Sequence, residues 1–273
     1  IQVRFNVVKW SLLPLLFPLS SACMAYHPPT NVVIYGDDAY PPYSYIENGQ
    51  AKGIYTEILQ AVFDGMPKYR VKITLVPWKR GLKLLEVGEG FALYPPYYYT
   101  DKRPYISPYS VPILNEEVVV YCQPDSVKSR QLKRWPADYL GLTIGINEAF
   151  ALGGTESWEA VKQGKIFLKE AKGNRANLLN LYKNRIDCYI NDRLSILWEI
   201  KLLTQEGAVK PNWELTLGTS ISGEQGYLGF TKVSPHKYPY KAHFVEKFNR
   251  TLEQLQKDGT VDNIMSKYLN NNN

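Results

Sequence analysis

A tyrosine-rich stretch around one arginine is the first candidate for chemistry in this sequence. The segment ALYPPYYYTDKRPY, residues 92–105, places Arg103 three positions after Thr100. A guanidinium group can bind a carboxylate through two parallel hydrogen bonds, and a tyrosine ring combines an apolar face with a polar tip. This combination could recognise a small zwitterion. The alternative is a well-packed strand end with a surface arginine, whose loose ion pair would contribute about 1 kcal/mol or less.

Short apolar runs alternate with segments of helical periodicity, and this order predicts an α/β fold. The predicted strands are residues 31–36, 69–78, 115–122, 140–147, 165–171, 185–192 and 226–232. The predicted helices are residues 53–66, 79–90, 154–165, 174–184, 193–203 and 241–269, the last of them interrupted at Gly259. Because the alternation starts again after residue 122, we expect two α/β units with a cleft between them.

The loops that follow the predicted strands hold most of the candidate residues. Ligands of open α/β sheets bind beyond the carboxyl ends of the strands. Aromatic and charged residues gather in five such loops: GDDAYPPYSY (36–45), PWKR (77–80), YPPYYYTDKR (94–103), INEAF (146–150) and NDR (191–193). We therefore expect these loops to converge on one crevice, which would give the tyrosine-rich stretch a ligand to recognise.

The composition is that of an ordinary globular protein, and the sequence gives no motif for nucleic-acid binding, metal binding or nucleophilic catalysis. The 273 residues are 45% hydrophobic and 21% charged, with a formal net charge of +6. The basic cluster KSRQLKR at 128–134 is typical of a solvated helix face, and no nucleic-acid-binding motif accompanies it. His27, His236 and His243 are isolated from one another. We therefore predict no metal site, no nucleophile–base pair and no cofactor.

The first 25 residues have the pattern of an export signal. Two basic residues precede the apolar run WSLLPLLFPL and the small residues SSACMA, and cleavage after Ala25 would release the mature chain into the periplasm. A lipoprotein processed before Cys23 is the alternative. Cleavage at Ala25 leaves Cys122 and Cys188 in an oxidising compartment, where they could form a disulfide or remain two small buried thiols.

The order of several segments resembles a known family of receptors. The segments are YPPYSYIENGQAKGIYTEIL, VPWKRGLKLLEVGEGFAL, YTDKRPYISPYS, NRIDCYINDR and LQKDGTVDNIMSKY. In this order they resemble the bacterial extracellular solute-binding proteins of the polar amino acid type, family 3, which are periplasmic binding proteins of ABC importers. The resemblance extends from about Asn31 to Leu269, and the last of the five segments is the most specific.

The resemblance implies a two-lobed periplasmic-binding-protein-like fold of type II. Each lobe would be a mostly parallel sheet flanked by helices. Residues 26–114 would begin the first lobe, residues 115–221 would form the second, and residues 222–273 would return to the first. The two hinge crossings would lie near residues 114–117 and 222–226. The family's antiparallel pairing in the second lobe would place the end of VVVYC near the start of DCYI, which favours a Cys122–Cys188 disulfide.

The resemblance also assigns roles to three charged residues. Arg103 falls on the family's arginine for the ligand carboxylate. Asp192 falls on the acid for the ligand ammonium group, on the opposite lobe, although an aspartate there could instead cap the helix 193–203. Asp37 falls where the family often has a polar ligand contact, although it could be only a turn residue.

Aromatic residues would complete the site, and some positions depart from the family. Tyr40, Trp78 and Tyr98 could form apolar walls and contact an ammonium group. Asn147 replaces a residue that is often basic, and Phe150 lies in a segment, Glu148 to Phe150, where the family often has Ser-Gly-Thr. These departures predict added bulk and a ligand that is either an aromatic or otherwise unusual amino acid or not an amino acid at all.

The predicted function is therefore solute capture. The chain would bind an amino acid or similar small carboxylate by hinge closure and deliver it, as a monomer without catalytic chemistry, to the permease of an ABC importer. One alternative is a dehydratase acting on a cyclic carboxylate, with Glu148 or Asp37 as the acid. Another is a soluble sensor that presents its ligand to a membrane receptor.

Overall fold

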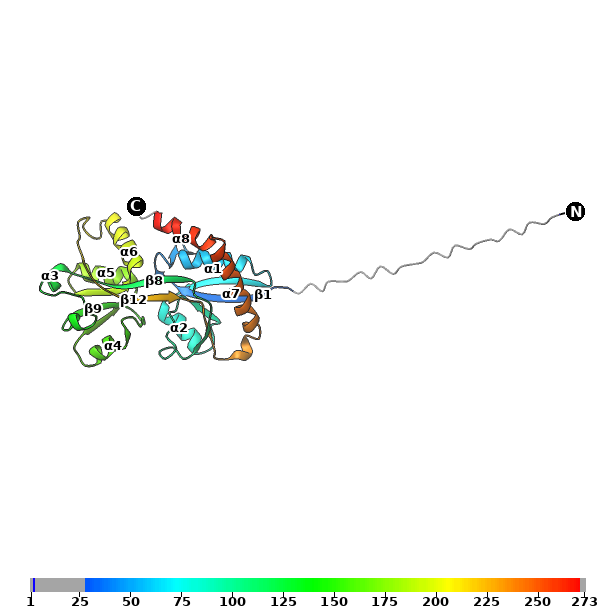
Figure 1. The fold of residues 1–273 in the computed structure, drawn as a ribbon, viewed down its shortest axis with the longest axis horizontal. Helices are drawn as coiled ribbons and strands as arrows, with labels where there is room; N and C mark the ends of the chain where they lie inside the picture. Colours follow the sequence, from blue (N-terminus) through cyan, green and yellow to red (C-terminus); the bar gives the residue numbers. More distant parts are fainter. Residues whose placement is uncertain (1, 3–27, 271–273) are drawn as a thin grey trace.

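The protein folds into two lobes joined by a pair of long strands (Figure 1). This computed structural model describes Gln2 and residues 28–270. The predicted export signal, residues 1–25, and the lipoprotein alternative at Cys23 lie outside the described residues. None of the helices within residues 28–270 combines the length and the apolar character needed to cross a bilayer.

The first lobe contains a five-stranded sheet in the order β5-β1-β6-β13-β7 and a small three-stranded sheet, β2-β3-β4. Val32 and Ile34 on β1 are buried, because alternate side chains of a strand face the same side. The strands are β1 (Thr30–Asp37), β2 (Ala39–Tyr40), β3 (Ser44–Glu47), β4 (Gln50–Lys52), β5 (Tyr69–Val76), β6 (Ala92–Tyr94), β7 (Ile106–Tyr109) and β13 (Gly229–Thr231).

The second lobe contains a five-stranded sheet in the order β10-β9-β11-β8-β12. Its strands are β8 (Leu114–Cys122), β9 (Thr143–Asn147), β10 (Phe167–Ala171), β11 (Cys188–Asp192) and β12 (Thr216–Gly226). Each of the two large sheets has two parallel and two antiparallel pairings. The predicted two-lobed α/β fold is thus confirmed, and in both sheets the parallel strands lie together on one side.

Helices cover both lobes. In the first lobe α1, α7 and α8 contact one another, and Gly259, in the left-handed conformation, separates the last two as the sequence predicted. The helices are α1 (Ile54–Asp64), α2 (Trp78–Glu86), α3 (Pro124–Val127), α4 (Gly154–Lys162), α5 (Gly173–Tyr182), α6 (Arg193–Gln205), α7 (Lys241–Lys257) and α8 (Thr260–Asn270), with short 3-10 turns at Ala137–Tyr139 and Pro235–Lys237.

Strands β8 and β12 pass through the middle of the molecule side by side (Figure 1). They pair in antiparallel register, with Leu114 opposite Gly226 and Glu117 opposite Gly223. These are the segments in which the sequence placed the two hinge crossings. We propose that the lobe boundaries lie here, so that residues 26–114 and 222–273 form one lobe and residues 115–221 the other.

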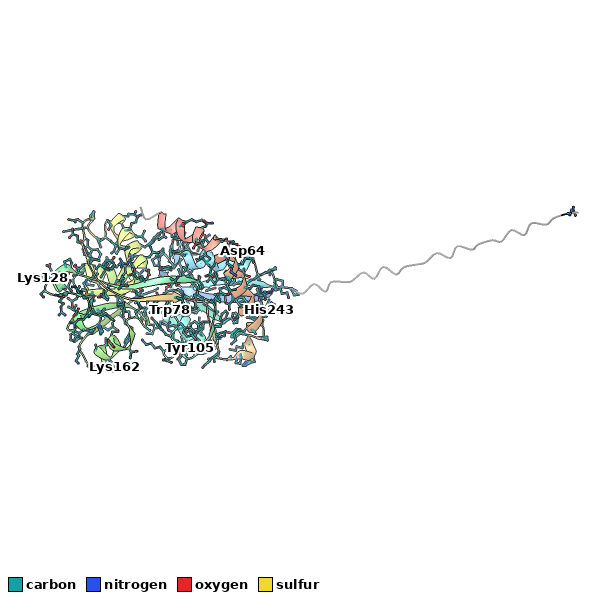
Figure 2. The ribbon with its side chains drawn as sticks, viewed as in Figure 1. Asp64, Trp78, Tyr105, Lys128, Lys162 and His243 are labelled. Carbon is teal, nitrogen blue, oxygen red and sulfur yellow. A yellow bond between two sulfur atoms is a disulfide. The ribbon has the colours of Figure 1, made fainter. Side chains whose placement is uncertain are left out.

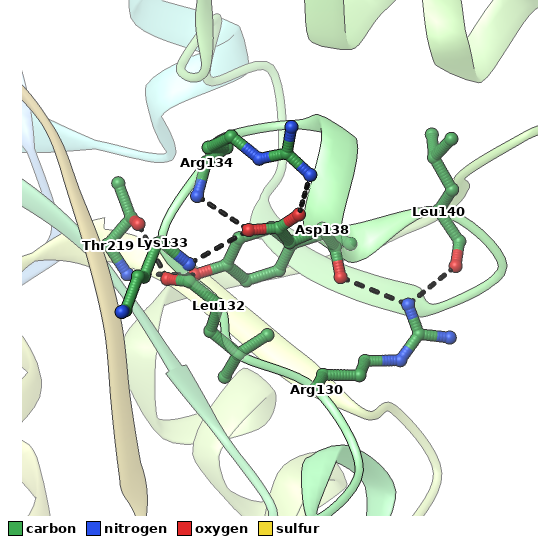
Figure 3. Close-up of polar contacts among 8 residues, drawn as sticks. Arg130, Leu132, Lys133, Arg134, Asp138, Leu140 and Thr219 are labelled. Carbon is green, nitrogen blue, oxygen red and sulfur yellow. Dashed lines mark hydrogen bonds and ion pairs between the residues drawn. The ribbon is translucent and has the colours of Figure 1, made fainter.

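The basic cluster at 128–134 is exposed, but it is not the helix face that its composition suggested. Residues 128–134 form turns and loop. Figure 3 shows why: the Asp138 carboxylate accepts hydrogen bonds from the backbone N–H groups of Lys133 and Arg134, at 3.0 and 2.8 Å, and pairs with the Arg134 guanidinium. Arg130 donates to the carbonyl groups of Asp138 and Leu140. The basic side chains therefore hold a loop together.

The predicted disulfide between Cys122 and Cys188 is confirmed. The two cysteines lie opposite each other in the antiparallel pairing of β8 and β11, and both are fully buried. The bond closes a sequence separation of 66 residues. It thereby connects β8, the strand that continues from the hinge, with β11, the central strand of the second lobe.

We expect that replacing both cysteines, in a Cys122→Ala/Cys188→Ala variant, lowers the free energy of unfolding by about 2–4 kcal/mol. A loop of this length restricts the unfolded chain strongly, and its loss restores that entropy. Urea unfolding with and without a reductant measures the effect. The reductant should lower the midpoint of the wild type and leave that of the variant unchanged; an equal response of both proteins would contradict the prediction.

Candidate functional site

A small cavity lies between the lobes, at the carboxyl ends of β1, β6 and β9. Its volume is about 20 Å³, which is room for about one water molecule. Figure 2 shows Trp78 near the middle of the molecule, between the two lobes. The lining residues are Asp37, Tyr40, Trp78, Pro95, Tyr97, Tyr99 and Arg103 from the first lobe and Phe150, Ala151 and Leu152 from the second.

Arg103 is the central charged residue of this cavity. Its side chain is 6% exposed, and its guanidinium lies 5.3 Å from the Trp78 ring and 5.9 Å from the Tyr99 ring. It donates one hydrogen bond to the Ala149 carbonyl, at 3.3 Å. Burial lowers the pKa of Arg103. Among the described residues no carboxylate forms an ion pair with it, so a buried cation with free donors faces the cavity.

Trp78 supplies both an apolar wall and a second free donor. It follows Pro77 at the start of α2, which directs its ring toward the lobe junction. The indole Nε1–H is buried and has no hydrogen-bond partner among the described residues. Buried polar groups normally have partners. An acceptor atom in the cavity could therefore bind Trp78 and Arg103 together.

Glu116, on β8, lies behind the cavity wall and was not among the predicted site residues. Its carboxyl group accepts hydrogen bonds from the hydroxyl groups of Tyr40, at 2.5 Å, Tyr97, at 2.6 Å, and Tyr55. Burial raises the pKa of Glu116 to about 8, and the nearby Asp192 carboxylate adds to the shift. The inward alternation of Leu114, Glu116 and Val118 on β8 is the signal that could have identified it.

Asp37 has both of the features that the sequence left open. It ends β1, and its Oδ1 accepts a hydrogen bond from the backbone N–H of Ala39 at 2.9 Å, as a turn residue does. It also lines the cavity and is 4% exposed. Burial raises the pKa of Asp37 to about 7. A role of Asp37 toward a ligand stays a prediction.

Asp192 is the N-cap of α6, which is the alternative noted for it. Its two carboxylate oxygens accept from the backbone N–H groups of Ser195, at 2.8 Å, and Glu117, at 3.1 Å. It is buried but does not line the cavity that contains Arg103. Burial raises the pKa of Asp192 to about 6. Its contact with a ligand ammonium group stays a prediction.

Tyr98 and Asn147 are not brought into this cavity. Tyr98 is 59% exposed and packs against Tyr109 and Tyr227, with ring centroids 4.8 and 5.9 Å away. Its neighbours Tyr97 and Tyr99 point inward instead. The buried Asn147 lines a second small cavity beside the first. It belongs to an amide network with Asn174, Asn177 and Tyr189, at 2.8–3.0 Å.

The lobes are in direct contact around the cavity. The Pro41 carbonyl of the first lobe accepts hydrogen bonds from the Ser195 hydroxyl, at 2.8 Å, and the Asn174 amide, at 3.3 Å, both of the second lobe. At one side of the cavity Lys172 pairs with Asp38 at 3.4 Å. These contacts define a closed arrangement, in which residues from both lobes surround the guanidinium.

We expect the free energy of unfolding to decrease as the pH rises from about 4.5 to about 8. Glu116, Asp37 and Asp192 have raised pKa values in the folded protein, so the folded state binds more protons than the unfolded chain in this range. The stabilisation from these groups is at its full value below their pKa in the unfolded chain, which is near 4. It is lost as the pH rises through their pKa values in the folded protein. Urea unfolding at pH 5, 6, 7 and 8 measures it.

Between pH 7 and 8 the free energy of unfolding should decrease less in the Glu116→Gln variant than in the wild type. Of the three carboxyl groups, Glu116 contributes most to the decrease in this range, because its pKa is the highest. Glu253→Gln is a matched control, because Glu253 is exposed on α7, and it should follow the wild type. The same pH slope in the Glu116→Gln variant and the wild type would contradict the assignment.

Comparison with known proteins agrees with this architecture. One relative, the probable amino-acid-binding protein YxeM of Bacillus subtilis (strain 168), is 25% identical over 230 residues, which are 84% of this chain and 80% of that protein. A histidine kinase sensor domain with similarity to periplasmic binding proteins has a TM-score of 0.70 at 18% identity, over 89% of this chain and 97% of that one.

A substrate-binding protein of an amino acid ABC transporter has a TM-score of 0.64 at 16% identity, over 87% of this chain and 98% of that one. These two structures support the fold. Residues 32–271 match the family model for bacterial extracellular solute-binding proteins, family 3. Since the match covers most of the sequence, the chain belongs to the bacterial extracellular solute-binding proteins, family 3.

Proposed function

We propose that this protein captures an amino acid or a similar small carboxylate in the periplasm and delivers it to an ABC importer. The ligand would bind between the two lobes, with its carboxylate on Arg103. Membership in the family supports solute binding, and the relative described as a probable amino-acid-binding protein supports this ligand class. The similarity to the substrate-binding protein of an amino acid transporter agrees with delivery to an importer.

The buried, unpaired guanidinium of Arg103 is the observation that carries the proposal. A charged group that leaves water loses its hydration and is normally paired. Among the residues that the structure describes, the Arg103 guanidinium contacts only the Ala149 carbonyl and the faces of Trp78 and Tyr99. A ligand carboxylate would give the guanidinium two charge-assisted hydrogen bonds. The Trp78 ring lies 5.3 Å from the guanidinium, and its buried Nε1–H, which has no partner among the described residues, would be a further donor for a ligand.

Closure of the lobes would follow from contacts that only the closed state can make. Arg103 lies in the first lobe, while Phe150, Ala151 and Leu152 reach the same cavity from the second. A ligand that touches both groups favours the closed arrangement by its differential affinity. The paired strands β8 and β12 are the connection about which the lobes would move.

Binding without catalysis accounts best for the arrangement. A dehydratase needs an acid of raised pKa held against its substrate. Glu148 is 43% exposed and lies 3.5 Å from Lys79, which is an ordinary surface ion pair. Asp37 has a raised pKa, but one of its oxygens is engaged by the turn that it forms. We therefore propose a receptor and not an enzyme.

A thermal-shift screen of amino acids and small carboxylates tests the proposal. A ligand at 100 times its Kd stabilises the folded protein by about 2.7 kcal/mol, which corresponds to roughly 5 °C or more for a chain of this size. The Arg103→Ala variant should lose the shift, because the carboxylate then has no cationic partner. Arg103→Lys should keep only part of it, since an ammonium group cannot form the two parallel bonds.

Arg70→Ala is the matched control, because Arg70 is exposed on β5 of the same lobe, and its shift should equal that of the wild type. An undiminished shift in the Arg103→Ala variant would remove Arg103 from the site. Turnover of a cyclic carboxylate, in the absence of any ligand-induced shift, would replace the receptor with the enzyme.

A further inference from the structure

The segment Ala149–Phe150 fills the lobe junction in a way that resembles a bound molecule. It follows β9 in the second lobe and reaches into the first. The Phe150 ring makes edge contacts with Tyr40 and Trp78 of the first lobe, at centroid distances of 5.6 and 5.9 Å. It packs against apolar clusters of both lobes while staying partly exposed. No other part of the cavity wall described here combines these contacts.

The backbone of the same segment binds the guanidinium of Arg103. The Ala149 carbonyl accepts the hydrogen bond that the Arg103 Nη2 donates, at 3.3 Å. An oxygen acceptor on Arg103, followed by an aromatic ring between Tyr40 and Trp78, is the pattern that a ring-bearing carboxylate would present. The distance of 3.3 Å and the neutral carbonyl make this a weaker bond than a bidentate ion pair.

Phe150 also lines two cavities at the junction. The cavity that contains Arg103 and a second one of similar size, about 20 Å³, share three lining residues: Asp37, Trp78 and Phe150. The Phe150 ring lines both volumes. Moving this ring away would enlarge the space beside the guanidinium.

The conformation of Ala149 makes release of the segment easier. Its φ angle is 62°, in the left-handed region that residues other than glycine adopt at a cost in free energy. The segment is anchored to β9 by the hydrogen bond from the Phe150 N–H to the Asn147 carbonyl, at 3.0 Å. A change of Ala149 to an unstrained conformation would move the ring and the carbonyl together.

We propose that Ala149 and Phe150 act as an internal substitute for the ligand, and that the site selects carboxylates bearing a planar apolar ring. Such a ligand would displace the segment, bind Arg103 through its carboxylate and refill the ring position between Tyr40 and Trp78. A carboxylate without a ring would replace only the weak Ala149 contact. This inference rests on the proposed function and adds to it the ligand class and the group that competes for the site.

L-phenylalanine and L-alanine are matched probes, since they differ only in the ring. We expect the wild type to bind L-phenylalanine more tightly in calorimetric titration. In the Phe150→Ala variant the internal competitor is absent, so the Kd for L-phenylalanine should fall about tenfold or more, by the fraction of protein that it had blocked. The Kd for L-alanine should change much less. Phe167→Ala is the matched control, because Phe167 is 55% exposed on β10.

Small-angle X-ray scattering gives a second measurement that needs no variant. Because the internal substitute already holds the lobes together, the radius of gyration of the wild type should not decrease when L-phenylalanine saturates it. The ligand-free Phe150→Ala variant should be more expanded and should contract on binding. A wild type that contracts on binding would overturn the proposal even if the variant failed to fold.

The outcomes separate this inference from the proposed function. Equal affinity for both amino acids, or an unchanged or higher Kd for L-phenylalanine in Phe150→Ala, overturns the internal substitute while Arg103-dependent binding stands. If no amino acid or small carboxylate binds either protein, the proposed function fails and the inference fails with it.

Discussion

The burial of a cation and an acid in one junction is the constraint on which this structure depends. Arg103 faces the cavity with its donors largely free, and Glu116 lies behind the wall. A direct ion pair between them would neutralise both and leave nothing for a ligand. No such ion pair is present among the described residues: the Tyr97 ring lines the cavity, and its hydroxyl group donates to Glu116. The tyrosines thus satisfy the acid and keep the cation available.

The same cluster connects the site to the hinge. Glu116 lies near the start of β8, and Tyr55 reaches it from α1. Gly226 on β12 lies opposite Leu114 of β8. It leaves the space that the Tyr55 hydroxyl group occupies, because a Cβ atom at this position would collide with that group. The requirement for glycine at this position is therefore steric. The hinge strands, the buried acid and the cavity wall form one packed unit, so a change in the cavity can affect the strands that join the lobes.

Much of the fold could be predicted from the sequence, because it follows from local periodicity. The short apolar run of β1 and the helix-ending Gly259 are local signals, and both elements lie where they were expected. The prediction of a helix face at 128–134 was wrong for a local reason. Its charges suggested a helix face, but Asp138, four and five residues further on, accepts hydrogen bonds from the backbone of Arg134 and Lys133 and holds the segment as a loop.

The candidate site was predictable only in part. Arg103, Trp78, Tyr40, Asp37 and Phe150 do line one cavity. Consecutive tyrosines cannot be told apart by type, so the sequence could not decide that Tyr98 lies outside the cavity while both its neighbours lie inside. Nor could it decide between the ligand contact and the cap of α6 for Asp192, whose Oδ1 accepts from the backbone of that helix. These outcomes depend on backbone direction at loop residues, which periodicity does not determine.

A receptor whose own side chains occupy its site binds by exchange. The free energy gained by the ligand is then the difference between its contacts and the internal ones that it replaces. A ligand ring can replace the aromatic contacts that Phe150 makes with little loss of free energy, whereas a small polar ligand makes none of these contacts. The guanidinium contributes to every carboxylate alike. Discrimination among carboxylate ligands would therefore come from the ring position. The large side chain of Phe150, where the family often has a small residue, would set this selectivity.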